Sequence, residues 1–149
     1  MKSSPGINTK KNIMSKLTEK EKVEKTIKHL NKTYGWELYK TENEFCHWDA
    51  QSADIIVELK FRKDTYPDKY LQVDKFLSLL MAADFYDKML YYIVIDQEVS
   101  IFNLKDLKDE LLKSKIHIQQ APYSTEFKDR TKKVDKYFYI LEPKHKTKL

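Results

Sequence analysis

The sequence predicts an α/β domain in which one sheet is flanked by helices, and three observations carry that prediction. Residues 54 to 62 and 89 to 95 form apolar runs rich in β-branched and aromatic side chains, which are typical of strands. Residues 18 to 35 and 69 to 86 have the periodicity of helices with one apolar face. Helices therefore alternate with strands along the chain, an order that favours helices packed on the faces of a sheet.

The first helix has both a start signal and a stop signal. Thr18 followed by Glu21 has the spacing of a capping box, and Gly35 is suited to end the helix. The apolar stripe between them consists of Val23, Ile27, Leu30 and Tyr34. We expect this helix to pack on the sheet through that stripe.

Three extended segments are expected after the first helix. They are residues 36 to 41, residues 45 to 51, which are extended or turned, and residues 54 to 62, which form the clearest strand. A proline-containing turn at residues 66 to 68 then leads into a long helix from Lys69 to Tyr86.

The second half of the chain predicts a buried strand followed by peripheral elements. Met89 to Ile95 is apolar on both faces, as expected of a strand that is covered on both sides. A strand from Val99 to Phe102 follows, and Asn103 can cap a helix that carries three leucines. Two further strands are expected, at residues 115 to 119 and 135 to 141.

Length and composition predict one intracellular domain with basic ends. The 149 residues are enough to bury a core without disulfides or structural metal. We expect a flexible basic arm at residues 1–17, a single domain at residues 18–142 and a basic tail at residues 143–149. The single cysteine, Cys46, excludes an internal disulfide and suits a reducing compartment such as the cytoplasm. No apolar run approaches the roughly 20 residues that span a bilayer, so no membrane is expected as a partner.

Charge is distributed unevenly along the chain, although the formal net charge is only +5. Residues 1 to 33 carry +6, residues 34 to 127 carry −6 and residues 128 to 149 carry +5. Basic ends around an acidic centre would suit a polyanion at the periphery and a cation at the centre, although solvating lysine-rich ends explain the pattern equally well. The whole chain has two glycines, which excludes the glycine-rich loops of Rossmann and P-loop nucleotide binding.

The strand at residues 54 to 62 carries charge where an interior strand should carry none. Because side chains alternate along a strand, Glu58 and Lys60 share one face about 6.6 Å apart, and the opposite face is wholly apolar. Burying both charges costs several kcal/mol per ion unless they are paired or bind a metal. The alternative is an ordinary salt-bridge ladder on a solvated sheet.

Asp49 is the acid that we expect to join Glu58. A tight reversal would pair residues 49 to 51 with residues 54 to 56 and place Asp49 diagonally across the hairpin from Glu58. Asp54 is the competing candidate. About 13 Å of strand separates it from Glu58, which is too far for the two to share one ion.

Gln72 interrupts the buried stripe of the second predicted helix, which is centred on Phe76. Because this helix begins where the charged strand ends, Gln72 is expected near Glu58 and Lys60. A core amide bonded to the backbone is the alternative. Lys75 lies at the edge of the same face, where it either contacts the site or is a solvated flank.

An acid before a hairpin, then Glu58-Leu59-Lys60 in the next strand, then a helix with an inward Gln72, resembles the PD-(D/E)XK nuclease superfamily. The resemblance covers about residues 18 to 102. It implies the restriction-endonuclease-like core, with element order α-β-β-β-α-β and a mixed sheet flanked by helices. Trp48 stands where the superfamily pattern has proline before the aspartate.

The resemblance implies a Mg²⁺-dependent endonuclease in which Mn²⁺ can substitute. The cation would be held by Asp49, Glu58 and the backbone carbonyl of Leu59. Lys60 would contact the attacking water or the scissile phosphate, where negative charge develops. The implied catalytic residues are Asp49, Glu58, Lys60, Gln72 and, on the first helix, Glu24.

Nucleic acid is the implied partner, and DNA is favoured over RNA. Duplex cutting usually calls for two active sites, so a homodimer is expected. Restriction, recombination, repair and viral or phage DNA metabolism all remain open as pathways. A non-catalytic nucleic-acid-binding module of the same fold and an RNA endonuclease remain as alternatives. The basic residues expected to hold the backbone are Arg62, Lys63, Lys75, Lys128, Arg130, Lys132 and Lys133.

Overall fold

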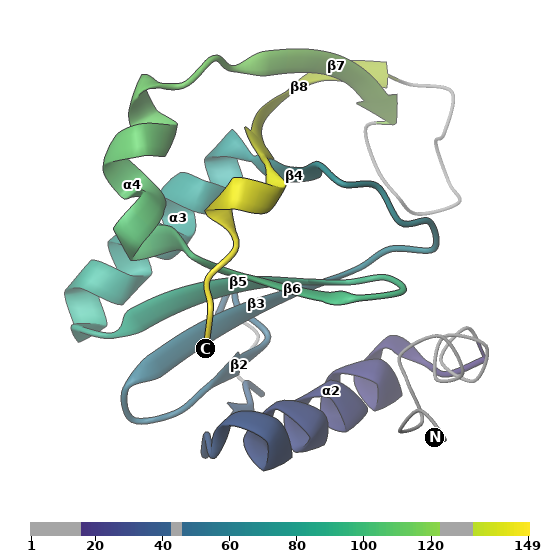
Figure 1. Ribbon diagram of the computed structural model, residues 1–149, viewed down its shortest axis with the longest axis vertical. Helices are drawn as coiled ribbons and strands as arrows, with labels where there is room; N and C mark the ends of the chain where they lie inside the picture. The colour runs from purple at the N-terminus through teal and green to yellow at the C-terminus, as the bar shows by residue number, and fades with distance from the viewer. Residues whose placement is uncertain (1–15, 43–45, 123–132) are drawn as a thin grey trace.

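The computed structural model describes residues 16–42, 46–122 and 133–149, which form two sheets and three main helices. The larger sheet lies across the middle of the molecule, with one helix below it and two helices and the smaller sheet above it (Figure 1). Within the described residues, no helix is long and apolar enough to cross a membrane.

The first helix, α2 (Glu19–Tyr34), has the ends that the sequence predicts. The Thr18 side chain accepts from the Glu21 N–H and the Glu21 side chain reaches back to the Thr18 N–H, so the capping box is formed. Gly35 adopts the left-handed conformation at φ 70°, which a residue with a side chain adopts only with strain. Both signals are confirmed.

The larger sheet is mixed, as the resemblance implies. Its strands lie in the order β1-β2-β3-β5-β6, and β3 runs parallel to β5 while the other neighbours are antiparallel. The parallel pair is joined by a crossover that contains a helix, as such pairs require. The strands are β1 (Tyr39–Lys40), β2 (Ala50–Gln51), β3 (Ile55–Phe61), β5 (Met89–Ile95) and β6 (Val99–Asn103).

Each face of this sheet has its own core. The alternation in β3 is as expected, since Val57 and Leu59 pack with α2 below the sheet while Ile56 packs above it. The upper core lies against α3 (Val73–Tyr86) and α4 (Leu104–Lys113), and the Asn103 side chain caps α4 by accepting from the Asp106 N–H. The side chain of Glu58 therefore points to the upper layer.

The helix expected from Lys69 to Tyr86 is wrong at its start, because residues Lys69–Gln72 form a strand, β4. β4 is an edge of the smaller sheet, which has the order β4-β8-β7 and includes β8 (Lys133–Leu141) and β7 (His117–Pro122). Lys69 and Leu71 are buried whereas Tyr70 is exposed, which is the period of a strand and not of a helix. Pairing with β8, which is distant in the sequence, decides the conformation here.

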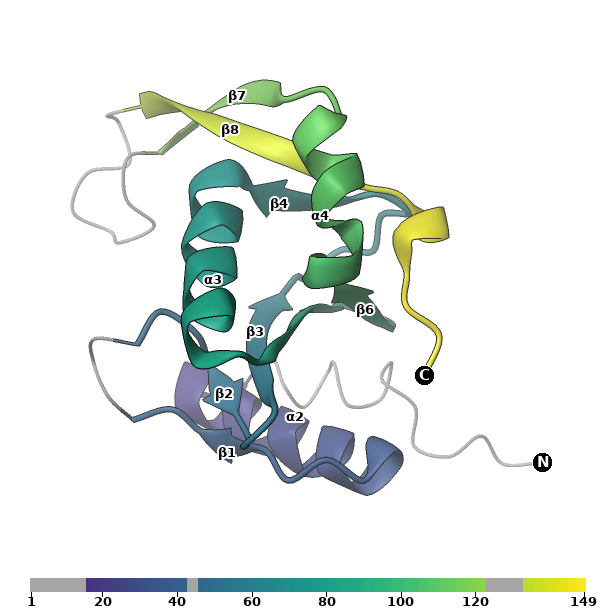
Figure 2. The same ribbon diagram turned by 90° about the vertical axis from the view of Figure 1, so that its left-hand side faces the viewer.

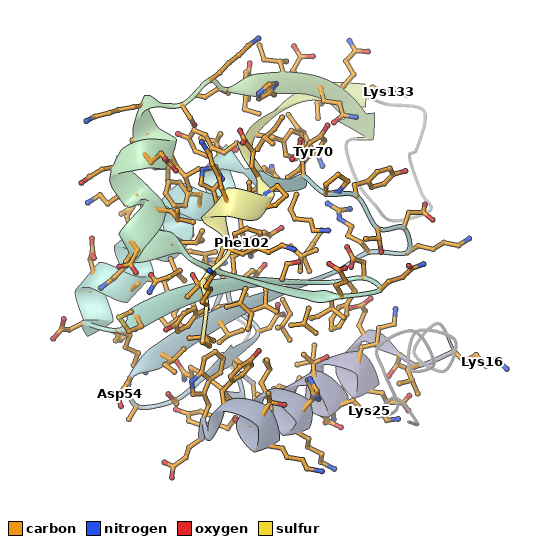
Figure 3. The ribbon with its side chains drawn as sticks, viewed as in Figure 1. Lys16, Lys25, Asp54, Tyr70, Phe102 and Lys133 are labelled. Atoms are coloured by element: carbon orange, nitrogen blue, oxygen red, sulfur yellow. The ribbon has the colours of Figure 1, made fainter. Side chains whose placement is uncertain are left out.

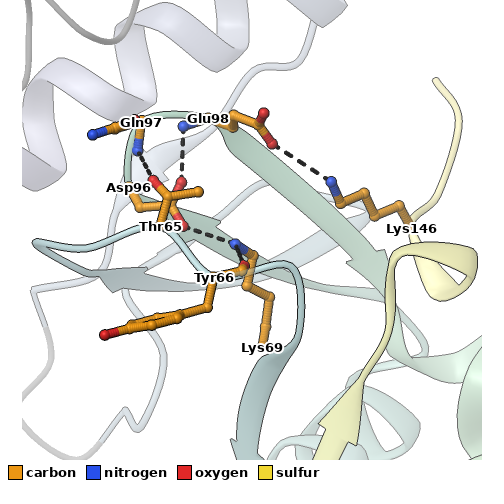
Figure 4. Close-up of polar contacts among 7 residues, drawn as sticks. All are labelled: Thr65, Tyr66, Lys69, Asp96, Gln97, Glu98 and Lys146. Carbon is orange, nitrogen blue, oxygen red and sulfur yellow. Dashed lines mark hydrogen bonds and ion pairs between the residues drawn. The ribbon is translucent and has the colours of Figure 1, made fainter.

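The buried lysine of β4 connects the two sheets. The Lys69 ammonium lies 2.8 Å from the Asp96 carboxylate, donates to the Tyr66 carbonyl, and is almost fully buried, as Asp96 is (Figure 4). The other Asp96 oxygen accepts from the Glu98 N–H at 2.8 Å. This network ties the segment after β3 to the β5–β6 turn, so it fixes where that segment lies.

The basic tail is attached to the domain. Residues Pro143–His145 form a 3₁₀ turn, η2, and the Thr147 N–H donates to the Ile101 carbonyl at 2.7 Å. The His145 ring lies 2.6 Å from the Glu110 carboxylate of α4. These contacts hold the C-terminal segment against β6 and α4.

Candidate active site

The β2–β3 hairpin brings Asp49 and Glu58 together in a register that differs from the expected one. Gln51 pairs with Ile56 and Ala50 with Val57, so the turn lies one residue later than the tight turn expected at residues 52 and 53. The Ser52 N–H donates to the Ile55 carbonyl at 2.8 Å and closes a tight turn at residues 53 and 54. The difference moves Asp49 from a diagonal position to one directly opposite Glu58.

Asp49 is held in place by two hydrogen bonds to β3. Its N–H donates to the Val57 carbonyl at 3.1 Å, and its side-chain oxygen Oδ2 accepts from the Leu59 N–H at 2.8 Å. The second bond aims the carboxylate along β3 toward Glu58 and leaves its other oxygen for a further partner.

The Glu58 carboxylate is in an environment that disfavours its charge. Its side chain is only 13% exposed. Burial, followed by the nearby Asp49 carboxylate, raises the pKa of Glu58 from 4.5 to about 8, and a hydrogen bond between the two side chains acts in the same direction. Two acids that share one desolvated site in this way are a candidate for cation binding.

Lys75 supplies a positive charge inside this site. Its Nζ lies 3.2 Å from Oε2 of Glu58 and donates to the His47 carbonyl at 2.6 Å. The sequence placed Lys75 at the edge of the helix face and assigned it to nucleic-acid binding. In the structure its ammonium lowers the pKa of Glu58 and so offsets part of the cost of burying that carboxylate.

Lys60 lies two residues along β3 from Glu58 and reaches solvent. Partial burial, followed by the charge of Arg62, lowers the pKa of Lys60, and Lys136 and Lys75 contribute in the same direction. Lys136, on β8, was missed by sequence reasoning. No local signal could have found it, because only the pairing of β8 with β4 brings it near β3.

Two aromatic residues connect the site to the smaller sheet. Tyr92 stands beside Glu58 in the β3–β5 register, and its hydroxyl donates to the Tyr70 carbonyl at 3.1 Å. Burial raises the pKa of Tyr92. The ring of Tyr70, which is 45% exposed, lies against Phe138, with ring centroids 5.6 Å apart. These contacts fix β4 and β8 beside the acidic pair.

Gln72 does not lie on a helix face, because it is the last residue of β4 and the N-cap of α3. It pairs with Phe138 of β8, it is half-buried, and its side chain makes no capping hydrogen bond. Glu24 is exposed on α2, which covers the face of the sheet opposite to the one from which Glu58 projects. The catalytic roles of Gln72 and Glu24 stay predictions.

The basic residues predicted to bind nucleic acid are distributed over several elements. Arg62 and Lys63 are exposed just after β3, and the Arg62 N–H donates to the Ile95 carbonyl at 2.9 Å. Lys133 is exposed where β8 begins, and Asp54 lies far from it at the β2–β3 turn (Figure 3). Lys128, Arg130 and Lys132 lie outside the described residues.

The donor set around Glu58 suits a hard divalent cation. Two carboxylates face each other, and the Leu59 carbonyl points to the Asp49 side, because the N–H and C=O groups of a strand residue point the same way. In the part of the chain that the structure describes, no three His, Cys, Asp or Glu side chains cluster in a way that could hold a metal. A bound Mg²⁺ would therefore keep several waters, as it usually does.

A mixed sheet in which the β2–β3 hairpin is followed by a crossover helix, with helices on both faces, is the restriction-endonuclease-like fold. A solved structure has the same fold: a Holliday junction resolvase, Hjc, from the archaeal hyperthermophile Archaeoglobus fulgidus. The match has a TM-score of 0.50 and 15% identity, and it covers 85% of this chain and 86% of that chain. At the level of sequence, no protein-family model and no curated protein matches the chain.

Proposed function

We propose that this protein is a Mg²⁺-dependent endonuclease of the PD-(D/E)XK type that acts on DNA. The observation that carries the proposal is the meeting of the Asp49 and Glu58 carboxylates on one side of β3, with Lys60 two residues further along. Such a cluster is costly to bury without a cation, and a Holliday junction resolvase has the same fold. We expect the cost to be offset when the cation binds.

The roles that we assign follow from the charges of the three side chains. Asp49, Glu58 and the Leu59 carbonyl would hold the cation, which supplies positive charge near the scissile phosphate and makes a neighbouring water more acidic. Lys60 would donate hydrogen bonds to the phosphate oxygens as negative charge develops on them. Burial, followed by the charge of Arg62, lowers the pKa of Lys60, and the cationic neighbours that contribute suit an anionic substrate.

The reaction is a hydrolysis without a covalent enzyme intermediate. A water oxygen forms a new bond to phosphorus, and the bond from phosphorus to one sugar oxygen breaks. The sugar oxygen leaves with a proton as an alcohol, and the other strand end keeps the phosphate. No oxidant or further reactant is required.

DNA binding is proposed to use basic side chains that border the acidic pair. Arg62 and Lys63 extend β3 beyond Lys60, and Lys136 approaches from β8. Contacts of these residues with phosphates would give affinity that falls with salt and does not depend on sequence. Because the structural neighbour is named as a Holliday junction resolvase, branched DNA is the first substrate to test.

The test is cleavage by purified protein of plasmid, single-stranded, branched and RNA substrates, with Mg²⁺, with Mn²⁺ and with EDTA. We expect Asp49→Asn, Glu58→Gln and Lys60→Ala each to lose cleavage while keeping most binding. Asp54→Asn is the matched control, because Asp54 is an exposed acid on the same hairpin.

Three outcomes decide between the candidate functions. Cation-dependent cleavage of DNA that is lost in the three variants and kept in the control supports the proposal. Cleavage confined to RNA favours an RNA endonuclease. Binding without any cation-dependent cleavage by the wild type favours a non-catalytic nucleic-acid-binding module.

A further inference from the structure

The outer face of α3 carries an apolar stripe that no described residue covers. Leu77, Met81 and Phe85 lie four residues apart, so they share one face of the helix. Their exposures are 43%, 73% and 81%, whereas the opposite face of α3 is buried in the upper core. Single exposed apolar side chains are ordinary, but a contiguous row marks an interaction surface.

Further exposed apolar side chains lie at and just after the end of the helix. Tyr86, its last residue, is 54% exposed, and its ring is in edge contact with Phe85, with centroids 4.9 Å apart, and with Trp48, with centroids 6.1 Å apart. Met89, the first residue of β5, is 39% exposed. Figure 2 shows α3 on the outside of the molecule beside α4. The exposed apolar area of the stripe together with Tyr86 and Met89 is on the order of 600 Å², close to the roughly 800 Å² that each partner buries in a standard interface.

The charges at its border argue against nucleic acid or an anionic membrane as the occupant. Asp74, Asp84 and Asp87 are all exposed on or just after α3. Asp84 has a basic neighbour, Lys105, at 3.4 Å, but the other two add negative charge at either end of the stripe. A polyanion would be repelled here, so the surface suits a protein with an apolar face.

The stripe is self-complementary, which favours a second copy of this chain. It is centred on Met81, with one large apolar residue four positions before it and one four positions after it. Two α3 helices that cross antiparallel at Met81 would place Leu77 of each copy against Phe85 of the other.

We propose that the outer face of α3 is a two-fold interface between two copies of this chain, centred on Met81. Lys75, which marks the active-site end of α3, is six residues from Met81, or about 9 Å along the helix axis. The two candidate sites would therefore be offset by about 18 Å along that axis, comparable with five base pairs of duplex. The dimer does not depend on the proposed function, whereas paired cutting by its two sites rests on it.

The oligomeric state tests the interface without any assay of activity. We expect light scattering over a wide concentration range to show a wild-type dimer, and Phe85→Glu to raise its Kd by at least about thirtyfold. Phe85 is exposed, so this change should leave the fold intact, which circular dichroism checks. Ile118→Glu is the matched control, an equally drastic change at a side chain that is 64% exposed on β7. A wild type that stays monomeric, or a control that dissociates as Phe85→Glu does, overturns the proposal.

Cross-linking tests the two-fold axis itself. With Cys46 replaced by serine, Met81→Cys should form a disulfide-linked dimer rapidly, because the axis passes beside residue 81. Leu77→Cys should cross-link poorly with itself and well with Phe85→Cys in a mixture. Equal self-cross-linking of the Leu77→Cys and Met81→Cys variants would contradict a two-fold axis centred on Met81.

Cleavage gives a separate result. A monomeric Phe85→Glu protein should still nick one strand, and paired cuts should fall at least about tenfold relative to nicks. If the wild type is a dimer that cleaves nothing, the proposed function fails and the interface stands. If the monomeric variant makes paired cuts as well as the wild type does, the interface has no role in pairing the sites and the link to function is overturned.

Discussion

Replacing Glu58 by glutamine should stabilise the protein in the absence of divalent cations. The folded state raises the pKa of Glu58 from 4.5 to about 8. Between those values the folded protein binds more protons than the unfolded chain, so the free energy of unfolding of the wild type falls as pH rises. A glutamine at the same position does not titrate, and the variant should lose this part of the pH dependence.

The magnitude follows from the pKa values. A rise from 4.5 to about 8 corresponds to at most about 5 kcal/mol of disfavoured charge above pH 8. The raised pKa already includes the opposing effect of the Lys75 ammonium, which lies 3.2 Å from the carboxylate. Because the folded carboxyl is only half ionised at its pKa and a glutamine amide does not reproduce its hydrogen bonds, we expect Glu58→Gln to raise the free energy of unfolding by about 2 to 4 kcal/mol near pH 8. Near pH 5, where Glu58 is protonated in the folded protein, the two proteins should differ by less than about 1 kcal/mol.

Urea denaturation in EDTA across this pH range measures the effect, with Asp54→Asn as a control for the loss of an exposed acid from the same hairpin. The same denaturation measurements are then repeated with Mg²⁺ in place of EDTA. A cation held by Glu58 stabilises the wild type by about 2.7 kcal/mol at a hundredfold excess over Kd, and it should stabilise Glu58→Gln much less. Parallel pH profiles for the wild type and Glu58→Gln, or a variant that is less stable at pH 8, would refute the reasoning about the buried acid.

Three further outcomes are expected. Asp96→Asn should cost about 3 to 5 kcal/mol of stability, because it leaves the buried Lys69 ammonium without its counter-charge, and thermal unfolding measures the loss. A double change of Lys69 to Met and Asp96 to Leu should recover much of it, and an equally unstable double variant would contradict that explanation. Lys136→Ala should weaken binding to DNA of any sequence, and it should reduce the dependence of the binding constant on salt concentration by the amount expected for about one phosphate contact. An unchanged salt dependence would argue against a phosphate contact. Thr18→Ala should lower the free energy of unfolding by about 1 kcal/mol through loss of the α2 cap, and an unchanged urea midpoint would show that the cap contributes nothing.

Much of the fold was predictable because its signals are local. The capping box at Thr18, the left-handed Gly35 and the two-sided apolar strand at Met89–Ile95 each specify a conformation within a few residues. The alternation in β3 was equally local, and it assigned Glu58 to the correct face of the sheet. At these positions local propensity and tertiary packing favour the same conformation, so the local sequence was enough to predict that conformation.

The start of the second helix was mispredicted because a distant partner decides it. Read alone, residues 69 to 72 fit the start of a helix, because Gln72 falls on the stripe that is centred on Phe76. In the folded chain they pair with β8, and Lys69 is buried because Asp96 meets it from the β5–β6 turn. The partner of this strand is more than sixty residues away, and the acid that pairs with the buried lysine lies on another element. Neither can be recognised from a short window of sequence.

The site was only partly predictable for the same reason. Asp49 and Glu58 stand out in the sequence because acids next to an apolar strand break a local rule. Lys75, which pairs with Glu58, comes from α3, and Lys136, whose charge acts on Lys60, comes from β8, so only the packing of those elements brings them close. Sequence reasoning could therefore name the two acids and place Lys75 at the edge of the helix face, but it gave neither the ion pair of Lys75 with Glu58 nor Lys136.

Two features that cost stability, a buried acid and a second acid beside it, occur together at the β2–β3 hairpin, and this bears on function. Elsewhere the two buried clusters are mainly apolar, and the buried charges of Lys69 and Asp96 are paired at 2.8 Å. At the β2–β3 hairpin the chain instead keeps two adjacent acids, and Lys75 balances only one charge at 3.2 Å. A neutral side chain at position 58 would make the fold more stable in the absence of a cation, so an ionisable side chain there is required by the proposed cation site and not by stability.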